Sequence, residues 1–134
     1  METTGIKTQM QFDAKMIARY RERIAQLQHG IGAHASTHEL VQGGRHGDRV
    51  ADAACNILQL EAHMQRHINN IGSHMALLDV PLQREIIRLR YIEGMDWEAI
   101  SAKLQYSKAH LYRPHRQAMI AIDAKLATSP KPLA

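Results

Sequence analysis

The sequence has 134 residues, a length typical of one ordinary domain or two very small ones. Apolar residues make up 45% of it, but it has only one Phe, one Trp and four Tyr, so the apolar content is mainly Ala, Ile, Leu and Met. This composition favours helices, which excludes an all-β sandwich and predicts an all-α fold. The single cysteine, Cys55, excludes a disulfide framework and a cysteine-based zinc finger, and we expect it to be a small buried thiol of a protein in a reducing compartment.

The net charge of +4 is unevenly distributed along the chain. Residues 1–80 hold 8 Lys and Arg and 8 Asp and Glu, whereas residues 81–134 hold 9 basic and 5 acidic residues. The excess positive charge therefore lies in the last part of the chain, which indicates an anionic partner such as nucleic acid. No apolar run approaches the length of a membrane helix, and no secretory signal is recognised, so we expect a cytoplasmic protein with no membrane partner.

The first predicted helix covers residues 10–31. From Ile17 its apolar residues recur at alternating steps of three and four, which is the pattern of a heptad seam. Gly30 and Gly32 are expected to end this helix. Residues 32–47 are rich in glycine and are predicted to form a loop, with a helical turn near residues 38–42.

The second predicted helix covers residues 48–78, with Asp48 as its N-cap. Its apolar residues recur every seven positions and form a predicted assembly seam. The seam consists of Val50, Ile57, Leu60, Met64, His67, Ile71 and His74. The two long helices could pair as an antiparallel hairpin within one chain or form a coiled coil with a second subunit, and a homodimer is the favoured oligomer. Residues 1–79 are thus predicted to be an assembly or partner-binding region.

Three shorter helices are predicted to follow Pro81, which suits the first turn of a helix. They cover residues 82–93, 97–104 and 108–127, with Gly94 ending the first and with Asp96 and Ser107 capping the other two. The last two helices, joined by a three-residue turn, have the layout of a helix-turn-helix DNA reader. Residues 80–127 are therefore predicted to be a DNA-binding domain, and residues 128–134 a disordered tail.

The inner faces of the predicted helix pair are apolar. Trp97, Ile100 and Leu104 on the first helix are expected to face Leu111 and Ala118 on the second. The outer face of the second helix is polar and basic. The predicted DNA contacts are Ser107, Lys108, His110, Tyr112, Arg113, Arg116 and Gln117. Arg can bind guanine edges, Gln can pair with adenine, Lys can hold phosphate, and the capped helix start offers backbone N–H groups to a phosphate.

The stretch REIIRLRYIEGMDWEAISAKL, at residues 84–104, and the stretch YSKAHLYR, at residues 106–113, resemble the C-terminal part of ArpU/RinA-type phage transcriptional regulators. They resemble, more distantly, the helix-turn-helix of sigma factor region 4. The similarity covers about residues 80–126, and the N-terminal part is similar only in layout. The resemblance implies a DNA-binding regulator, encoded by a phage or prophage and associated with the nucleoid in the cytoplasm of a bacterial host. It also implies a DNA-reading role for Ser107, Lys108, His110, Arg113 and Arg116.

Pro114 departs from the pattern of these regulators, which usually have Leu or another helix former at this position. Proline in a helix interior removes one hydrogen bond and its ring clashes with the carbonyl four residues earlier, here that of His110. The sequence therefore predicts a kink at Pro114, which affects the placement of Arg116 and Gln117 more than that of the residues before it.

The remaining chemistry in the sequence favours neither a metal site nor an enzyme. His63 and His67 have a spacing that can chelate zinc, but no Cys, Asp or Glu shares their stripe, so we expect no metal or other cofactor. The seam histidines, His67 and His74, are expected to form hydrogen bonds across the helix interface. Cys55 has no general base that could activate it, and no phosphate loop or nucleophile elbow is present, so we expect no enzymatic activity.

Two other functions fit the same layout. A small terminase-like DNA-packaging protein also couples a helix-turn-helix to oligomerising helices, and a ring-shaped oligomer would favour it over a dimeric regulator. A protein-binding module that docks on RNA polymerase, as sigma region 4 does, would show no salt-sensitive binding to duplex DNA.

Overall fold

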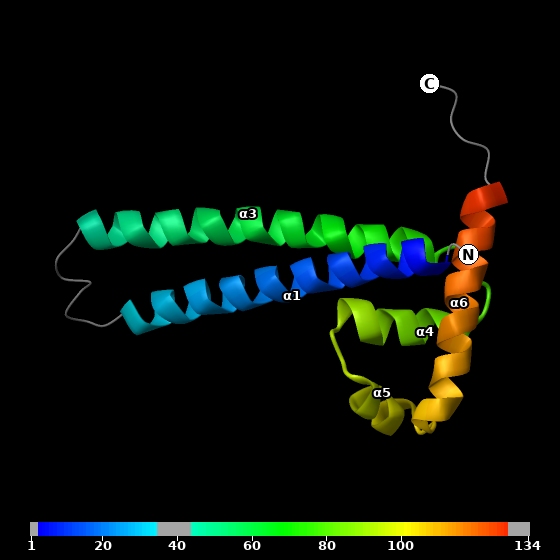
Figure 1. Cartoon of the computed structure of the whole chain (residues 1–134). Coiled ribbons are helices and arrows are strands. Elements are labelled where there is room, and N and C mark those ends of the chain that lie inside the picture. The colour runs from blue at the N-terminus through cyan, green and yellow to red at the C-terminus, as the bar shows by residue number, and fades with distance from the viewer. Residues whose placement is uncertain (1–2, 35–43, 129–134) are drawn as a thin grey trace. The chain divides into compact units, whose positions relative to one another are not determined.

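The computed structural model describes residues 3–34 and 44–128, which are helical apart from short connections (Figure 1). The all-α class is therefore confirmed. In chain order the elements are α1 (Thr3–His34), α3 (Gly44–Met75), α4 (Pro81–Ile87), the π-helix η1 (Arg88–Ile92), α5 (Trp97–Leu104) and α6 (Lys108–Thr128). None of the helices in these two ranges is both long and apolar enough to cross a bilayer.

The chain divides into two compact units at positions that differ from the predicted boundary at residue 79. One unit contains residues 1–15 and 68–134, and the other contains residues 16–67. The start of α1 and the end of α3 therefore belong with the C-terminal helices. The physical reason is that Ile6 and Met10 on α1, and Ile71 near the end of α3, are buried in the core of that unit.

Helix α1 extends further at both ends than predicted, whereas α3 begins before and also ends before the predicted bounds of residues 48–78. Gly30 and Gly32 lie inside α1, which begins at Thr3 and continues to His34. A glycine costs a helix only about 1 kcal/mol relative to Ala, so it does not by itself end one. Helix α3 begins at Gly44 and ends at Met75, so Asp48 lies inside the helix and is not its N-cap. The predicted helical turn at residues 38–42 lies outside the described residues, as do residues 129–134 of the predicted tail.

Within the unit of residues 16–67, α1 and α3 run antiparallel (Figure 1). Ile17 and Ile24 are buried on α1, and the ring of Tyr20 stacks on His63 and His67 of α3, with centroid distances of 5.8 and 5.9 Å. The seam residues of α3 in this unit are partly buried, whereas most of their neighbours are exposed. These partly buried residues are Val50, Ile57, Leu60, Met64 and His67.

These contacts show that the two long helices pair within one chain, as the hairpin alternative predicted. Cys55 is exposed on α3, so the expectation of a buried thiol was wrong. Cys55 falls outside the repeating seam positions, on an exposed side of α3.

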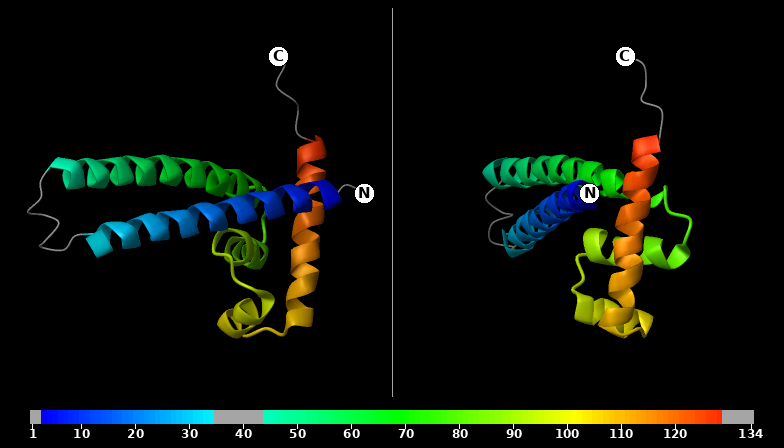
Figure 2. Two further views of the ribbon diagram at one scale, coloured as in Figure 1. Left: turned by 60° about the vertical axis from the view of Figure 1, so that its left-hand side comes forward. Right: turned by 45° about the vertical axis from the view of Figure 1, so that its right-hand side comes forward.

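The second unit is built around α4, η1, α5 and α6, which pack on one another (Figure 2). The centre of this core contains four almost fully buried residues, one from each element. They are Ile86, Leu89, Ile100 and Leu111, and Leu82, Met95, Trp97 and Leu104 pack around them. Further along α6, Ala118, Met119 and Ile122 are also buried. Burial of these residues holds α4, η1, α5 and α6 together, since short helices such as α4, η1 and α5 are not stable alone.

The predicted helix ends in this unit are confirmed by their hydrogen bonds. Pro81 occupies the first turn of α4, and the Asp96 carboxylate accepts a hydrogen bond of 2.8 Å from the backbone N–H of Ala99 at the start of α5. Gly94 has φ +74°, a left-handed conformation that suits glycine. The predicted helix over residues 82–93 differs in one respect, because its second half is the π-helical turn η1. The bond from Glu93 N–H to the Arg88 carbonyl, 3.0 Å long, closes that wider turn.

Candidate nucleic-acid interface

The turn between α5 and α6 is fixed by hydrogen bonds at both of its ends. Gln105 adopts the left-handed conformation, with φ 61°, and its N–H donates to the Ser101 carbonyl at 2.8 Å. The Ser101 hydroxyl donates to the carbonyl of Tyr106 at 2.5 Å. The Ser107 hydroxyl then accepts from the N–H of His110 at 3.2 Å, which makes Ser107 the N-cap of α6 as predicted. This turn sets the direction in which α6 leaves α5.

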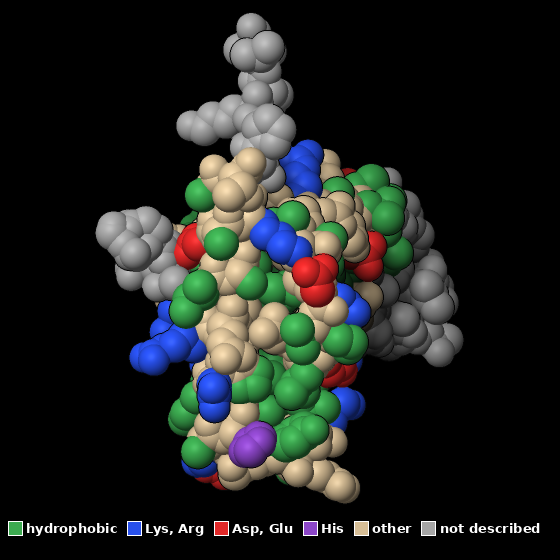
Figure 3. Space-filling view, turned by 90° about the vertical axis from the view of Figure 1, so that its right-hand side faces the viewer, with side chains coloured by type: hydrophobic (Ala, Val, Ile, Leu, Met, Phe, Trp, Pro, Cys, Tyr) green, Lys and Arg blue, Asp and Glu red, His purple; other side chains and the backbone are tan. Residues whose placement is uncertain are grey.

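Helix α6 has one buried face and one exposed face. The buried face contains Leu111, His115, Ala118, Met119 and Ile122. All of the predicted DNA contacts are exposed, namely Ser107, Lys108, His110, Tyr112, Arg113, Arg116 and Gln117. Helical geometry places Arg113, Arg116 and Gln117 on neighbouring turns of the side away from the core. Figure 3, which looks onto α6, shows Lys and Arg side chains interspersed with apolar ones over this surface.

Three of the predicted contacts already have partners within the unit. The ammonium of Lys108 forms an ion pair of 3.0 Å with Glu98 on α5, and hydrogen bonding to that carboxylate raises the pKa of the lysine. The ring of His110 stacks on Tyr106 with centroids 5.6 Å apart, and Tyr112 meets the edge of Trp97 at 5.2 Å. Lys108 therefore points back toward α5, and it can hold a phosphate only by leaving Glu98.

Arg113, Arg116 and Gln117 differ from these three. No salt bridge or side-chain hydrogen bond to another part of residues 3–34 or 44–128 holds any of them. Their guanidinium and amide groups are thus available to a ligand.

Pro114 lies in the middle of α6, which continues through it as one helix to Thr128. The proline lacks an N–H, so the His110 carbonyl lacks its usual partner from that position. The predicted disturbance at Pro114 therefore does not end the helix, and Arg116 and Gln117 remain helical.

A buried polar pair that the sequence did not predict lies beside this interface. Nε2 of His115 and the hydroxyl of Tyr91 are 2.7 Å apart, and His115 is only 9% exposed. Burial, together with the positive charges of Lys7 and Arg90, lowers the pKa of His115 to about 4. Burial also raises the pKa of Tyr91 to about 12, so both groups are neutral at pH 7. The signal was available, since His115 falls four residues after Leu111 and three before Ala118, on the buried stripe.

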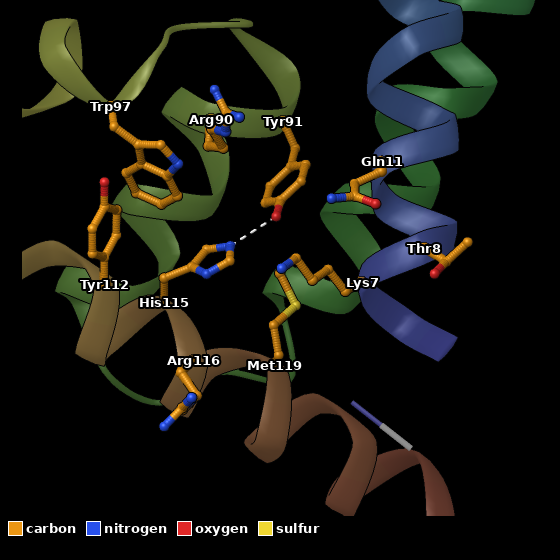
Figure 4. Close-up of a pocket in the computed structure, with 10 residues that line it drawn as sticks. All are labelled: Lys7, Thr8, Gln11, Arg90, Tyr91, Trp97, Tyr112, His115, Arg116 and Met119. Carbon is orange, nitrogen blue, oxygen red and sulfur yellow. Dashed lines mark hydrogen bonds between the residues drawn. The ribbon is translucent and has the colours of Figure 1, made fainter. Parts of the chain in front are cut away.

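A pocket of about 720 Å³ opens beside this pair, and Figure 4 shows its walls. It lies within the unit of residues 1–15 and 68–134 and is lined by Lys7, Thr8, Gln11, Arg90, Tyr91, Trp97, Tyr112, His115, Arg116 and Met119. Two predicted DNA contacts, Tyr112 and Arg116, are among them. The contribution of α1 to this pocket was not expected from the sequence.

The histidines of the predicted seam lie in two environments. His63 and His67 flank the ring of Tyr20, and His74 is half-buried near Asp13. Burial lowers the pKa of His74, and the negative charge of Asp13 partly opposes this effect. Over the described part of the chain, no three or more His, Cys, Asp or Glu side chains are grouped closely enough to hold a metal ion.

Comparisons with known proteins leave the function to be argued from these residues. No family model matches the chain, and neither curated proteins nor solved structures gave a match.

Proposed function

We propose that this protein binds duplex DNA and regulates transcription, with α6 placed in the major groove. The observation that carries the proposal is the geometry of α5 and α6. A rigid, doubly capped turn joins a short helix to a longer one whose exposed face presents Arg113, Arg116 and Gln117 without competing partners. This is the arrangement in which a recognition helix enters the groove while the preceding helix packs across it.

The roles of the side chains follow from their surroundings. Arg113 and Gln117 are suited to base edges, because guanidinium and amide groups can each form two hydrogen bonds to a purine. The exposed start of α6 at Ser107 offers backbone N–H groups to a phosphate. Lys108 contributes less than the sequence suggested, because Glu98 neutralises it. The resemblance of residues 84–113 to ArpU/RinA-type regulators supports a role in transcription.

The test is the binding of labelled duplex DNA by fluorescence anisotropy over a range of salt concentrations. We expect a linear fall of log K with log salt, with a slope of about −0.9 for each phosphate contact. Arg113→Ala should weaken binding by about 1–3 kcal/mol and relax sequence preference. Arg19→Ala is the matched control, since Arg19 is an exposed arginine on α1, outside the unit that carries α6.

Binding that does not depend on salt, or equal effects of the two substitutions, would overturn the proposal. In that case the same exposed face would serve a protein partner, such as RNA polymerase. Sizing the complex on DNA separates a dimeric regulator from the ring-shaped oligomer of a packaging protein.

A further inference from the structure

The pocket beside Tyr91 and His115 has an unusual balance of charge. Three cations line it from three different elements, Lys7 from α1, Arg90 from η1 and Arg116 from α6. Among residues 3–34 and 44–128, no Asp or Glu lines it. Like charges brought to one cavity repel each other unless an anion lies between them. The lining is therefore complementary to an anionic ligand.

Of the three cations, Lys7 extends toward the interior of the pocket, whereas Figure 4 shows Arg116 at the rim, pointing away from Tyr91 and His115. In Figure 4 the side chains of Lys7 and Met119 extend to the space beside the hydrogen bond between Tyr91 and His115. Lys7 and Arg90 are both close enough to lower the pKa of His115 by their charge. The imidazole stays neutral at pH 7, so it adds a hydrogen-bonding group and no further charge.

The remaining wall of the pocket is aromatic. The guanidinium of Arg90 lies over the ring of Trp97 at 5.2 Å, which occupies one face of the indole. The ring of Tyr112 packs perpendicular to that indole, and 48% of the surface of Tyr112 stays exposed. The exposed part of the tyrosine ring is a surface on which a second aromatic ring can stack. Thr8 and Gln11 add a hydroxyl and an amide to the same cavity.

We propose that this pocket binds a phosphorylated aromatic molecule of the nucleotide class. The phosphate groups lie among Lys7, Arg90 and Arg116, and the base stacks on Tyr112. The volume of about 720 Å³ is within the range of small-molecule sites. This site is distinct from the duplex interface in that Lys7 and Arg90 belong to it alone, whereas Tyr112 and Arg116 border both.

The full-length chain offers a direct measurement, because Trp97 is its single tryptophan and lines the pocket. ATP, adenosine and tripolyphosphate are titrated separately, and fluorescence of Trp97 is followed with calorimetry as a second readout. We expect ATP to bind saturably. Adenosine and tripolyphosphate should each bind at least about tenfold more weakly than ATP, because adenosine lacks the phosphate contacts and tripolyphosphate lacks the stacking of the base. Tripolyphosphate that binds as tightly as ATP would overturn the nucleotide class, and so would absence of ATP binding.

Two pairs of substitutions locate the binding. Lys7→Gln should weaken ATP binding roughly tenfold, the loss expected for one charge-assisted hydrogen bond, whereas Lys15→Gln, an exposed lysine of the same helix, should not. Tyr112→Ala should weaken it as well, whereas Tyr106→Ala, at a tyrosine of similar exposure, should not. Circular dichroism confirms that each variant is folded. Equal effects within either pair would overturn the proposal.

The two proposals fail separately. Arg113 does not line the pocket, so Arg113→Ala should lose duplex binding while ATP binding continues. If ATP does not bind and Lys7→Gln instead weakens duplex binding, the pocket is part of the DNA interface and the nucleotide proposal is wrong.

Discussion

Tyr91 and His115 share a buried hydrogen bond of 2.7 Å that joins the π-helical turn η1 to the middle of α6. Their rings also lie nearly parallel, with centroids 5.8 Å apart, and the indole of Trp97 from α5 packs perpendicular to the imidazole with centroids 5.0 Å apart. Three elements are thus joined at one histidine. Because that histidine lies directly behind the exposed face of α6, its state bears on both the stability of the unit and the position of the proposed DNA contacts.

Removing the Tyr91 hydroxyl should destabilise this unit. Tyr91→Phe leaves Nε2 of His115 buried without its partner, which we expect to cost about 1–3 kcal/mol of the free energy of unfolding. The measurement is urea denaturation followed by circular dichroism. Tyr106→Phe is the control, because that residue is 42% exposed and its ring stacks on His110 without needing the hydroxyl. Equal stability of the two variants would show that the buried bond contributes nothing.

Stability should also depend on pH through His115. Its pKa is about 4 in the folded protein and 6.5 ordinarily, so the unfolded chain binds the additional proton between these values. The free energy of unfolding is therefore highest above pH 6.5 and falls as the pH decreases toward 4, by roughly 2 kcal/mol between pH 7 and pH 5. The lowered pKa of His74 acts in the same direction.

The substitution His115→Gln isolates this contribution. Denaturation curves at pH 7 and pH 5 should differ less for this variant than for the unchanged protein. His29→Gln, at an exposed position of α1, should leave the full pH dependence in place. An unchanged pH dependence in His115→Gln would mean that another group is responsible.

Replacing Pro114 should stabilise α6. Pro114→Leu supplies an N–H to the His110 carbonyl and removes the ring clash, an effect of up to about 3 kcal/mol if the backbone relaxes. The helix continues past this position, and Pro114 is only partly buried, so a longer side chain has room. Thermal unfolding is the measurement, and Pro81→Leu is the control, because Pro81 stands in the first turn of α4, where proline is favourable. A lower melting temperature for Pro114→Leu would contradict this reasoning.

Neutralising Glu98 should strengthen duplex binding. Glu98→Gln releases the ammonium of Lys108 from its ion pair of 3.0 Å and removes a negative charge near the start of α6. We expect tighter binding and a salt slope that is steeper by about one phosphate contact. Glu61→Gln, an exposed position on α3, controls for the change in net charge. If both variants change equally, Lys108 does not contact DNA.

The C-terminal helices could be predicted from the sequence because their ends carry strong local signals. Pro81, Asp96 and Ser107 each act on residues within one turn, so their effects do not depend on the rest of the fold. The end of α1 was predicted wrongly because a glycine signal is weak and depends on the rest of the fold. Gly30 weakens a helix by about 1 kcal/mol, which contacts along a long hairpin outweigh.

The pocket could not be predicted, because it depends on contacts between distant parts of the chain. Lys7 precedes the first predicted helix by three residues, and nothing in its local sequence connects it with Arg116. The π-helical turn η1 could not be predicted either, since residues 88–92 have an ordinary helical composition. The heptad pattern correctly identified the partly buried side of α3. It did not identify the helix that packs there, because the same pattern is expected whether that helix belongs to the same chain or to a second subunit.

A nucleotide and duplex DNA should compete for binding to this protein, a prediction that depends on both proposals. Arg116 and Tyr112 line the pocket and also belong to the exposed face of α6. A bound nucleotide would therefore neutralise the charge of Arg116 with its phosphates and cover the ring of Tyr112 with its base. We expect ATP to weaken duplex binding and, by the reciprocity of linked equilibria, duplex to weaken ATP binding by the same factor. Anisotropy titrations with and without ATP at constant ionic strength measure the first factor, and Trp97 fluorescence measures the second. Lys7→Gln should shift the effect of ATP on duplex binding to about tenfold higher ATP concentration, and Lys15→Gln should leave it unchanged. If ATP binds in the pocket while duplex affinity is unchanged, Arg116 and Tyr112 contribute nothing to the DNA interface, and readout must depend on Arg113, Gln117 and the start of α6.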